Sequence, residues 1–290
     1  MALAASDTVV ERSGIFVCPD CKTTLQGNRC TACKGEFAVN DGVPVLFSRD
    51  AQYARSRELA QAYDAIYKAE TNVWERVGRT SDFITYFSGL LGRFKPNRFL
   101  EIGCGEGYLL SAVQSPDKWA VDLSREAIRS AQTKTRAEFC QALVERLPFP
   151  SDHFDVVTSV GVMEHFLDID VALREVARVV KPGGHYVTLT HVKPPFMERV
   201  ARKVSEYLLP PRPIALLRWL TTRAQPRPGD KRAAPKQPIQ NQLTRADGKR
   251  YLEANGFEVI EVIYQRRYPE LPLKGPFVVI YVARKPSSAK

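Results

Sequence analysis

Strand-like and helix-like segments alternate along the chain between Arg98 and His191. The strand-like segments are short runs rich in β-branched and aromatic residues, and between them apolar residues recur at the three- and four-residue spacing of helices. Two further strand-like segments, 257–264 and 277–284, follow near the C-terminus. The pattern predicts an α/β fold in which a doubly wound, mostly parallel, seven-stranded sheet is covered by helices. The strand-like segments of the alternating region are 98–103, 119–124, 137–143, 154–160 and 185–190.

The rest of the chain divides by composition. Residues 1–49 hold a cysteine cluster and a turn signal at Asp41-Gly42, which favours short strands. Residues 50–95 show helical spacing, and we expect them to form helices that cover the functional site. Residues 96–290 would then form the α/β domain, interrupted at about 193–249 by an insertion with nine prolines.

Most of the positive charge lies in this insertion. The formal net charge is +10, and between Lys193 and Lys249 there are 13 Lys and Arg residues against 4 Asp and Glu residues. We expect this insertion to be helical around 214–220 and mobile around 224–238, where proline and charge dominate. The position of the charged residues matters more than the total net charge, so the net charge alone does not identify a partner.

The sequence favours a cytoplasmic protein. The first fourteen residues lack the basic stretch and long apolar run of a secretory signal, and no uncharged apolar run approaches the ~18 residues that span a bilayer. Residues 208–220 place Trp219 and aliphatic residues beside Arg212 and Arg218, which suits peripheral contact with an anionic membrane at the inner face. A buried lid helix explains the same residues equally well.

Four of the six cysteines fall within sixteen positions, as two C-x2-C pairs separated by eight residues. Each pair forms a knuckle that directs two thiolates to one point, and two knuckles complete a tetrahedral site. Four thiolates leave no open position for catalysis, so we expect a structural Zn²⁺ in a zinc ribbon. Its predicted ligands are Cys18, Cys21, Cys30 and Cys33.

The first strand of the alternating region runs into a glycine-rich turn, Gly103 to Gly107, and then into a helix. Glycines let the backbone turn sharply and approach a ligand closely. The next strand ends in Asp122, seventeen residues after Gly105, where a carboxylate can accept the hydroxyl protons of a ribose. This combination predicts a nucleoside cofactor, although Asp122 could instead cap the following helix.

Between Phe99 and Thr190 these residues resemble the class I S-adenosylmethionine-dependent methyltransferases, especially the small-molecule group that includes the quinone-biosynthesis enzymes. LEIGCGEG matches their first motif, VDLS the second, ERLPFPSDHFDVV the third and fourth, and LREVARVVKPGGHYVTLT the helix and strand that follow. The resemblance implies a Rossmann-like fold and S-adenosylmethionine as cofactor. The ribbon and its tail are similar to the small zinc-binding subunits that activate several methyltransferases.

The resemblance also implies the cofactor contacts. Glu101 and the glycine turn should face the methionine part, Asp122 the ribose, and Leu123 the adenine. Leu143 stands where the family often has an acidic residue for the adenine amino group, so main-chain groups of Leu143 and Val144 must serve instead. The implied cofactor-binding residues are Glu101, Gly103, Cys104, Gly105, Gly107, Asp122, Leu123, Leu143, Val144 and Ser159.

His165 is the first candidate for a general base, because it follows the fourth strand and should lie at the carboxyl edge of the sheet. It could equally cap a helix or fill the pocket wall. Glu164 and His165 also resemble part of a metal cluster of some quinone O-methyltransferases, but Gly161 replaces its upstream Glu, so no metal is expected there. His191, at the end of the fifth strand, is the second candidate base.

Three functions remain open from the sequence. The chain could methylate a hydroxyl of a small molecule or of a lipid-linked saccharide, which is the function we favour. It could methylate ribosomal or transfer RNA, with the basic insertion neutralising phosphates and the ribbon docking a stem or loop. It could also be a non-catalytic scaffold, against which the intact Glu101, Gly103 and Asp122 argue.

Overall fold

The computed structural model describes residues 15–69, 81–193, 237–266 and 277–287. Most of the basic insertion, including the predicted helix around 214–220 and the membrane-contact segment 208–220, therefore lies outside the described residues. Among the helices that the structure describes, none combines the length and apolarity that a membrane crossing needs.

One nine-stranded sheet organises the chain, in the order β10-β11-β9-β8-β5-β6-β7-β4-β3. All seven predicted strands are present. Five run parallel to one another and the two C-terminal strands are antiparallel, which confirms the mostly parallel sheet. These seven strands are β5 (Arg98–Ile102), β6 (Asp117–Asp122), β7 (Glu138–Gln141), β8 (Phe154–Val160), β9 (Val180–Val192), β10 (Glu258–Arg266) and β11 (Phe277–Arg284).

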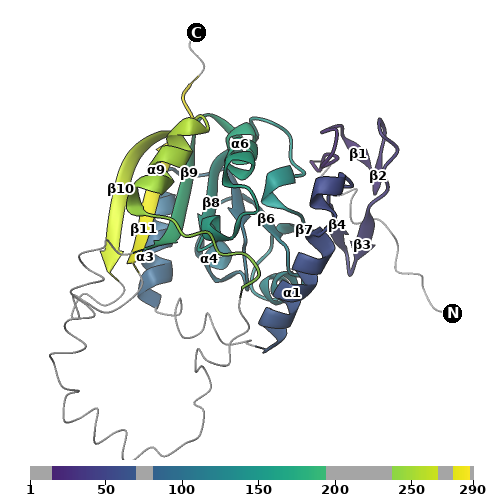
Figure 1. The fold of residues 1–290 in the computed structure, drawn as a ribbon, viewed down its shortest axis with the longest axis horizontal. Helices are drawn as coiled ribbons and strands as arrows, with labels where there is room; N and C mark the ends of the chain where they lie inside the picture. The colour runs from purple at the N-terminus through teal and green to yellow at the C-terminus, as the bar shows by residue number, and fades with distance from the viewer. Residues whose placement is uncertain (1–14, 70–80, 194–236, 267–276, 288–290) are drawn as a thin grey trace, which may run out of the picture.

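Two strands more than predicted come from the N-terminal region, which extends the sheet past β7 (Figure 1). β3 (Ala38–Asn40) and β4 (Val43–Val45) form a hairpin whose turn, Asp41-Gly42, has φ values of 49° and 76°, as hairpin turns of the primed types require. β4 lies parallel to β7, and the N–H of Leu46 donates to the Gln141 carbonyl at 2.8 Å. Pairing between residues almost a hundred positions apart leaves no mark in local sequence, so the strand count was too low.

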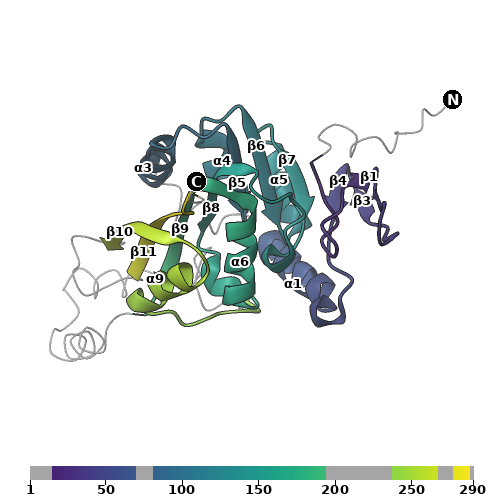
Figure 2. The ribbon, with the colours of Figure 1, turned by 90° about the horizontal axis from the view of Figure 1, so that it is seen from above.

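Helices cover both faces of the sheet (Figure 2). On one face α3, α4 and α5 pack Leu90, Leu110 and Ile128 against the sheet in one apolar cluster. On the other face α6 and α9 pack Leu173 and Leu252 in a second cluster. The helices are α1 (Ser56–Ala69), α3 (Ser81–Gly92), α4 (Tyr108–Ala112), α5 (Arg125–Gln132), α6 (Ile169–Val179) and α9 (Arg245–Ala254), with short 3-10 turns η1 (Ala51–Tyr53), η2 (Val144–Arg146) and η3 (Met163–His165).

The predicted end of the insertion, Lys249, falls inside α9. This helix begins after Thr244, whose hydroxyl accepts from the N–H of Asp247 while the Asp247 carboxylate accepts from the N–H of Thr244. Such a capping box marks the start of a helix, so the sequence around Thr244 already indicated that the insertion ends before this helix. α9 therefore belongs to the α/β domain.

The N-terminal ribbon shares its core with the α/β domain. Its two-stranded sheet consists of β1 (Leu25–Gln26) and β2 (Arg29–Cys30). Phe16 and Phe37 of the ribbon belong to the same apolar cluster as Phe149 and Phe154, and the rings of Phe16 and Phe149 lie 5.7 Å apart. A continuous core and a shared sheet make the ribbon an integral layer of the fold.

Candidate active site and metal centre

A cavity of about 390 Å³ opens at the carboxyl ends of β5, β6, β7 and β8. The strand order reverses between β5 and β8, and ligands of open parallel sheets bind at such a switch point. Among the predicted cofactor residues, the cavity lining contains Glu101, Gly103, Cys104, Gly105, Gly107, Asp122, Leu123, Leu143 and Val144.

The turn after β5 requires glycine for two reasons. Gly103 and Gly107 both adopt positive φ, 67° and 78°. A Cβ on Gly103 would lie 2.5 Å from a Val162 methyl, and one on Gly107 would lie 2.7 Å from the Cβ of Ala131. Side chains at these positions would be strained and would clash, so glycine is what lets the turn pass between β8 and α5.

Asp122 ends β6 with its carboxylate fixed by main-chain donors. One oxygen accepts from the N–H of Gly105 at 2.9 Å and the other from the N–H of Ser124 at 2.8 Å. Burial raises the pKa of this carboxyl to about 6, against the effect of these hydrogen bonds. Each oxygen has a second lone pair, so the side chain can still accept ribose hydroxyls in the cavity.

Glu101, on β5, is a buried carboxyl in the cavity lining with a raised pKa. Burial, with a smaller contribution from the charge of Asp122, raises its pKa to about 8. Its Oε2 atom is buried and has no hydrogen-bond partner among the described residues. A buried carboxyl oxygen of this kind would be satisfied by a cationic or hydrogen-bonding ligand, which fits the ammonium of a methionine moiety.

The segment 142–145, after β7, forms one side of the cavity. Leu143 and Val144 are buried, and no acidic side chain occupies position 143. Glu145 also lines the cavity, and its Oε1 accepts from the N–H of Leu167 at 2.7 Å. The segment is thereby attached to the loop before α6, and the adenine contacts implied for the main chain of Leu143 and Val144 stay a prediction.

Helix α1 supplies cavity residues that the sequence analysis missed. Tyr63 and Tyr67 line the cavity, and the Tyr67 hydroxyl lies 3.0 Å from where a Cβ of Gly105 would be. Between them, Asp64 accepts from the Ser124 hydroxyl at 2.6 Å and from the N–H of Glu126 at 3.2 Å. The sequence Tyr-Asp-x-x-Tyr was the available signal. Tyr63 and Tyr67 are four residues apart and therefore lie on the same face of the helix, which here faces the cavity. Asp64 lies next to that face and binds the start of α5.

His165, in η3, lies in the cavity wall as predicted. Its Nδ1 atom is 2.6 Å from the Ile239 carbonyl oxygen. A carbonyl only accepts, so Nδ1 carries the proton and, in the neutral ring, Nε2 is the basic nitrogen. Ile239 comes from the segment before α9, which the sequence analysis had assigned to the insertion.

His191 and Ser159 do not lie in the cavity lining. His191 directs Nδ1 to Oε1 of the buried Glu164 at 2.5 Å, and Thr190 donates to the other Glu164 oxygen at 2.8 Å. Ser159 bonds to the hydroxyls of Tyr186 and Thr188 inside the sheet, at 2.7 and 2.9 Å. Side chains alternate along β8, so Ser159 faces away from the cavity and the next residue, Val160, lines it. Gly161 and Val162, which follow the end of the strand, also line the cavity.

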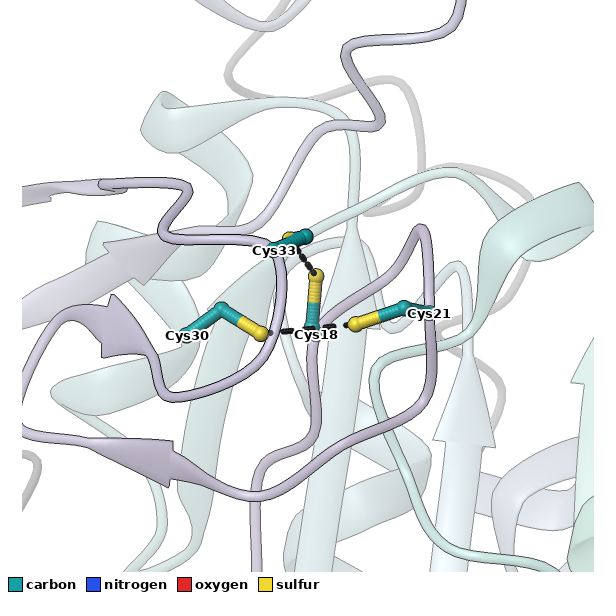
Figure 3. Close-up of side chains that lie close together, drawn as sticks. All are labelled: Cys18, Cys21, Cys30 and Cys33. Atoms are coloured by element: carbon teal, nitrogen blue, oxygen red, sulfur yellow. Dashed lines mark hydrogen bonds between the residues drawn. The ribbon is translucent and has the colours of Figure 1, made fainter.

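The four predicted zinc ligands come together at the tips of the two knuckles (Figure 3). Cys18 and Cys33 have their sulfurs 3.6 Å apart, Cys21 and Cys30 3.4 Å apart, and all four sulfurs lie within 4.8 Å of one another. Tetrahedral Zn²⁺ with Zn–S near 2.3 Å places sulfurs about 3.8 Å apart. The arrangement fits zinc, and these distances exclude disulfides.

Comparison with known proteins finds similarity to methyltransferases. Residues 100–188 match the family described as "Methyltransferase domain". The chain is 36% identical over 107 residues to the uncharacterized methyltransferase YcgJ of Bacillus subtilis (strain 168), covering 34% of this chain and 42% of YcgJ. It is 30% identical over 135 residues to the ubiquinone/menaquinone biosynthesis C-methyltransferase UbiE of Vibrio vulnificus (strain YJ016), covering 46% of each. The chain thus spans less than half the length of these relatives.

Among solved structures, the fold is similar to a chain of the complex between the Haloferax volcanii Trm112 methyltransferase activator and a protein assigned as a methyltransferase. The TM-score is 0.52 at 17% identity, covering 79% of this chain and 97% of the other. At this identity the similarity concerns the fold alone.

Proposed function

Because the chain contains a class I S-adenosylmethionine-dependent methyltransferase domain, we propose that it transfers a methyl group to a hydroxyl of a small, largely apolar molecule. The observation that carries the proposal is one cavity that is lined by the glycine turn, Asp122 and Glu101 and also by His165. A cofactor site and a basic nitrogen that share one cavity meet the geometric need of methyl transfer.

When bound, the cofactor supplies an electrophilic methyl group on a sulfonium. The residues of this chain hold and orient: Asp122 accepts the ribose hydroxyls, Glu101 faces the amino-acid part, and Leu143 with Val144 flanks the adenine. The apolar lining excludes water, which strengthens the few polar contacts that fix orientation.

His165 acts as the general base in this proposal. Its proton on Nδ1 is committed to the Ile239 carbonyl, so Nε2 would take the hydroxyl proton of an acceptor held in the cavity. The positive charge that forms on the ring is stabilised by that same carbonyl. Ile239 is therefore a positioning residue, acting through its main chain.

The apolar part of the cavity lining favours an apolar acceptor. Ile66 of α1 and Phe83 and Ile84 of α3 line it, together with Phe166 and the aromatic ring of Tyr63. A hydroxyl on a flat or branched apolar body would bury well against these side chains. A lipid-linked saccharide is the alternative within this class, entering with its polar end only.

The test incubates the zinc-loaded chain with methyl-labelled cofactor and separate host fractions: organic-soluble small molecules, lipid-linked saccharides and RNA. We expect label on a hydroxyl of an organic-soluble molecule, lost in the Asp122→Asn protein. Label on a carbon atom would indicate a C-methyltransferase, the activity that the name of UbiE gives. No label in any fraction, with intact cofactor binding, would favour the scaffold function.

RNA is the second candidate, and one described feature favours it. A groove between α9 and β10 combines Arg245, Lys249 and Arg250 with Tyr264, which is 60% exposed and lies 5.3 Å from the Arg245 guanidinium. Cations beside an exposed ring suit stacked bases. Lys249 is already paired with Glu253 and Arg250 with Asp247, which weakens this candidate. Label found only in RNA would establish it.

We also propose that residues 1–49 form a zinc ribbon in which the metal is structural, because all four coordination positions are taken by thiolates. Residues 50–95 cover the cavity through α1 and α3, and residues 96–290 form the catalytic domain.

A further inference from the structure

In each of the two cysteine knuckles, a lysine directly follows the second cysteine. The sequences are Cys18-Pro-Asp-Cys21-Lys22 and Cys30-Thr-Ala-Cys33-Lys34, and both lysines have positive φ, 60° and 58°. The main-chain N–H of Lys22 donates to the Cys18 carbonyl at 2.9 Å, which closes the first knuckle. The direction in which each lysine leaves its knuckle is therefore set by the fold around the metal.

These two lysines reach different surroundings. Lys22 Nζ crosses to the α/β domain, where it donates to the Leu147 carbonyl at 3.2 Å and pairs with Glu175 of α6 at 2.7 Å. Lys34 Nζ is exposed and donates at 2.7 Å to the carbonyl of Thr31 in its own knuckle. Only 26% of the Lys22 side chain is exposed, so its ion pair is shielded from solvent.

Lys22 joins a set of donors that hold three consecutive carbonyls. The Leu147 carbonyl also accepts from Arg178 at 3.0 Å, and Arg178 donates to the Phe149 carbonyl at 2.7 Å. The intervening Pro148 carbonyl accepts from the N–H of Val17, next to the first cysteine, at 3.0 Å. Glu175 pairs with both Lys22 and Arg178, so the ribbon and α6 form one network around this segment.

Segment 147–149 continues directly from the adenine wall at 142–145. The other end of that wall is also held by the N-terminal region, since the N–H of Leu46 donates to the Gln141 carbonyl. The Gln141 side chain in turn donates to the carbonyl of Leu123, next to the ribose carboxylate, at 2.9 Å. Both ends of the wall therefore depend on contacts from the first 46 residues.

We propose that the metal-bound ribbon positions the adenine wall of the cofactor cavity through Lys22, so that zinc occupancy and cofactor affinity are thermodynamically coupled. The inference rests on the proposed cofactor site. Zinc orders the first knuckle, the knuckle directs Lys22, and Lys22 with Val17 holds 147–149 in the position that shapes 142–145. Lys22 is a positioning residue, because it does not line the cavity.

Coupling between two sites is reciprocal. If zinc raises the affinity for the cofactor by some factor, the cofactor must raise the affinity for zinc by the same factor. Coupling free energies of this kind correspond to factors of roughly 5 to 150.

The test uses the full chain and S-adenosylhomocysteine as the probe. We compare Lys22→Met with Lys34→Met, which removes the equivalent lysine of the second knuckle. Neither change touches a zinc ligand, so both proteins should keep one zinc. Titration calorimetry should show binding at least about fivefold weaker in Lys22→Met, and unchanged in Lys34→Met. Lys22→Arg, which keeps a cationic donor, should recover part of the affinity.

A second measurement needs no variant. A chelator competes for zinc in the native protein with and without excess S-adenosylhomocysteine, and the probe should raise the zinc affinity about fivefold or more. Equal probe affinity in the wild type and both Met variants, or zinc affinity independent of the probe, would overturn the coupling and leave the proposed function standing. If no protein binds the probe, the proposed function fails, and the coupling with it.

Discussion

The carboxylate of Asp122 accepts a hydrogen bond from the main-chain N–H of Gly105 at 2.9 Å. This bond connects the carboxyl end of β6 to the turn after β5. The side chain proposed to hold the ribose thus also fixes the turn proposed to hold the methionine part. A single substitution at Asp122 should disturb both halves of the cofactor site.

Replacing Glu101 should change how stability depends on pH. Its pKa is about 8 in the folded chain and near 4.5 when unfolded, so the protonated form is favoured by folding. The stability it contributes is complete below pH ~4.5 and is lost as the pH rises to about 8. Glu101→Gln mimics the protonated form and should remove that loss.

Urea unfolding of both proteins without cofactor, from pH 5 to 9, measures this. The free energy of unfolding of the wild type should fall relative to Glu101→Gln as the pH rises. A difference that stays constant across the range would show that Glu101 is ionised throughout.

The chain should bind one zinc through Cys18, Cys21, Cys30 and Cys33, whose sulfurs are already gathered. Because the ribbon shares an apolar cluster with Phe149 and Phe154, removing the metal should lower the melting temperature of the whole chain. Elemental analysis of untagged protein and melting with and without a chelator check both points. Zinc content near zero after growth with ample metal would rule out the site.

Asp64→Ala should weaken cofactor binding from outside the cavity. Asp64 attaches α1 to the start of α5 through Ser124 and Glu126, and α1 carries Tyr63 and Tyr67 over the glycine turn. Loss of a charged anchor costs about 1–3 kcal/mol, or roughly 5- to 160-fold in affinity if it is expressed in binding. Glu58→Ala, an exposed change on the same helix, is the control. Equal affinity in the two proteins would mean that α1 holds its position without Asp64.

His165→Gln should lower turnover by about a hundredfold while cofactor affinity stays nearly unchanged. The Gln amide can still donate to the Ile239 carbonyl but cannot take a proton, so the substitution separates basicity from packing. Single-turnover rates with the identified acceptor are the measurement. Near-normal rates would shift attention to His191 and its Glu164 partner, or to an acceptor that needs no base.

The sequence was informative where function depends on local order. The glycine turn, Asp122 and the C-x2-C pairs have fixed spacing along the chain, so their chemistry could be predicted. In the structure the glycine turn contacts Asp122, and the four cysteines meet at a separate site. Tyr63, Tyr67 and Ile239 could not be placed in the same way, because they line the cavity only once α1 and the segment before α9 have packed beside the sheet. The pairing of β4 with β7 depends likewise on long-range contact. Ser159 was predicted to contact the cofactor, but it bonds to Tyr186 and Thr188 inside the sheet and does not line the cavity.

The central claim is that this chain holds S-adenosylmethionine at Asp122. Calorimetric titration of S-adenosylhomocysteine into zinc-loaded wild type, Asp122→Asn and Asp117→Asn tests it most directly, since Asp117 lies exposed at the opposite end of the same strand. We expect one site per chain in the wild type and in Asp117→Asn, and binding weaker by about 1–3 kcal/mol in Asp122→Asn. No binding to the folded wild type, or equal binding to all three proteins, would contradict the claim.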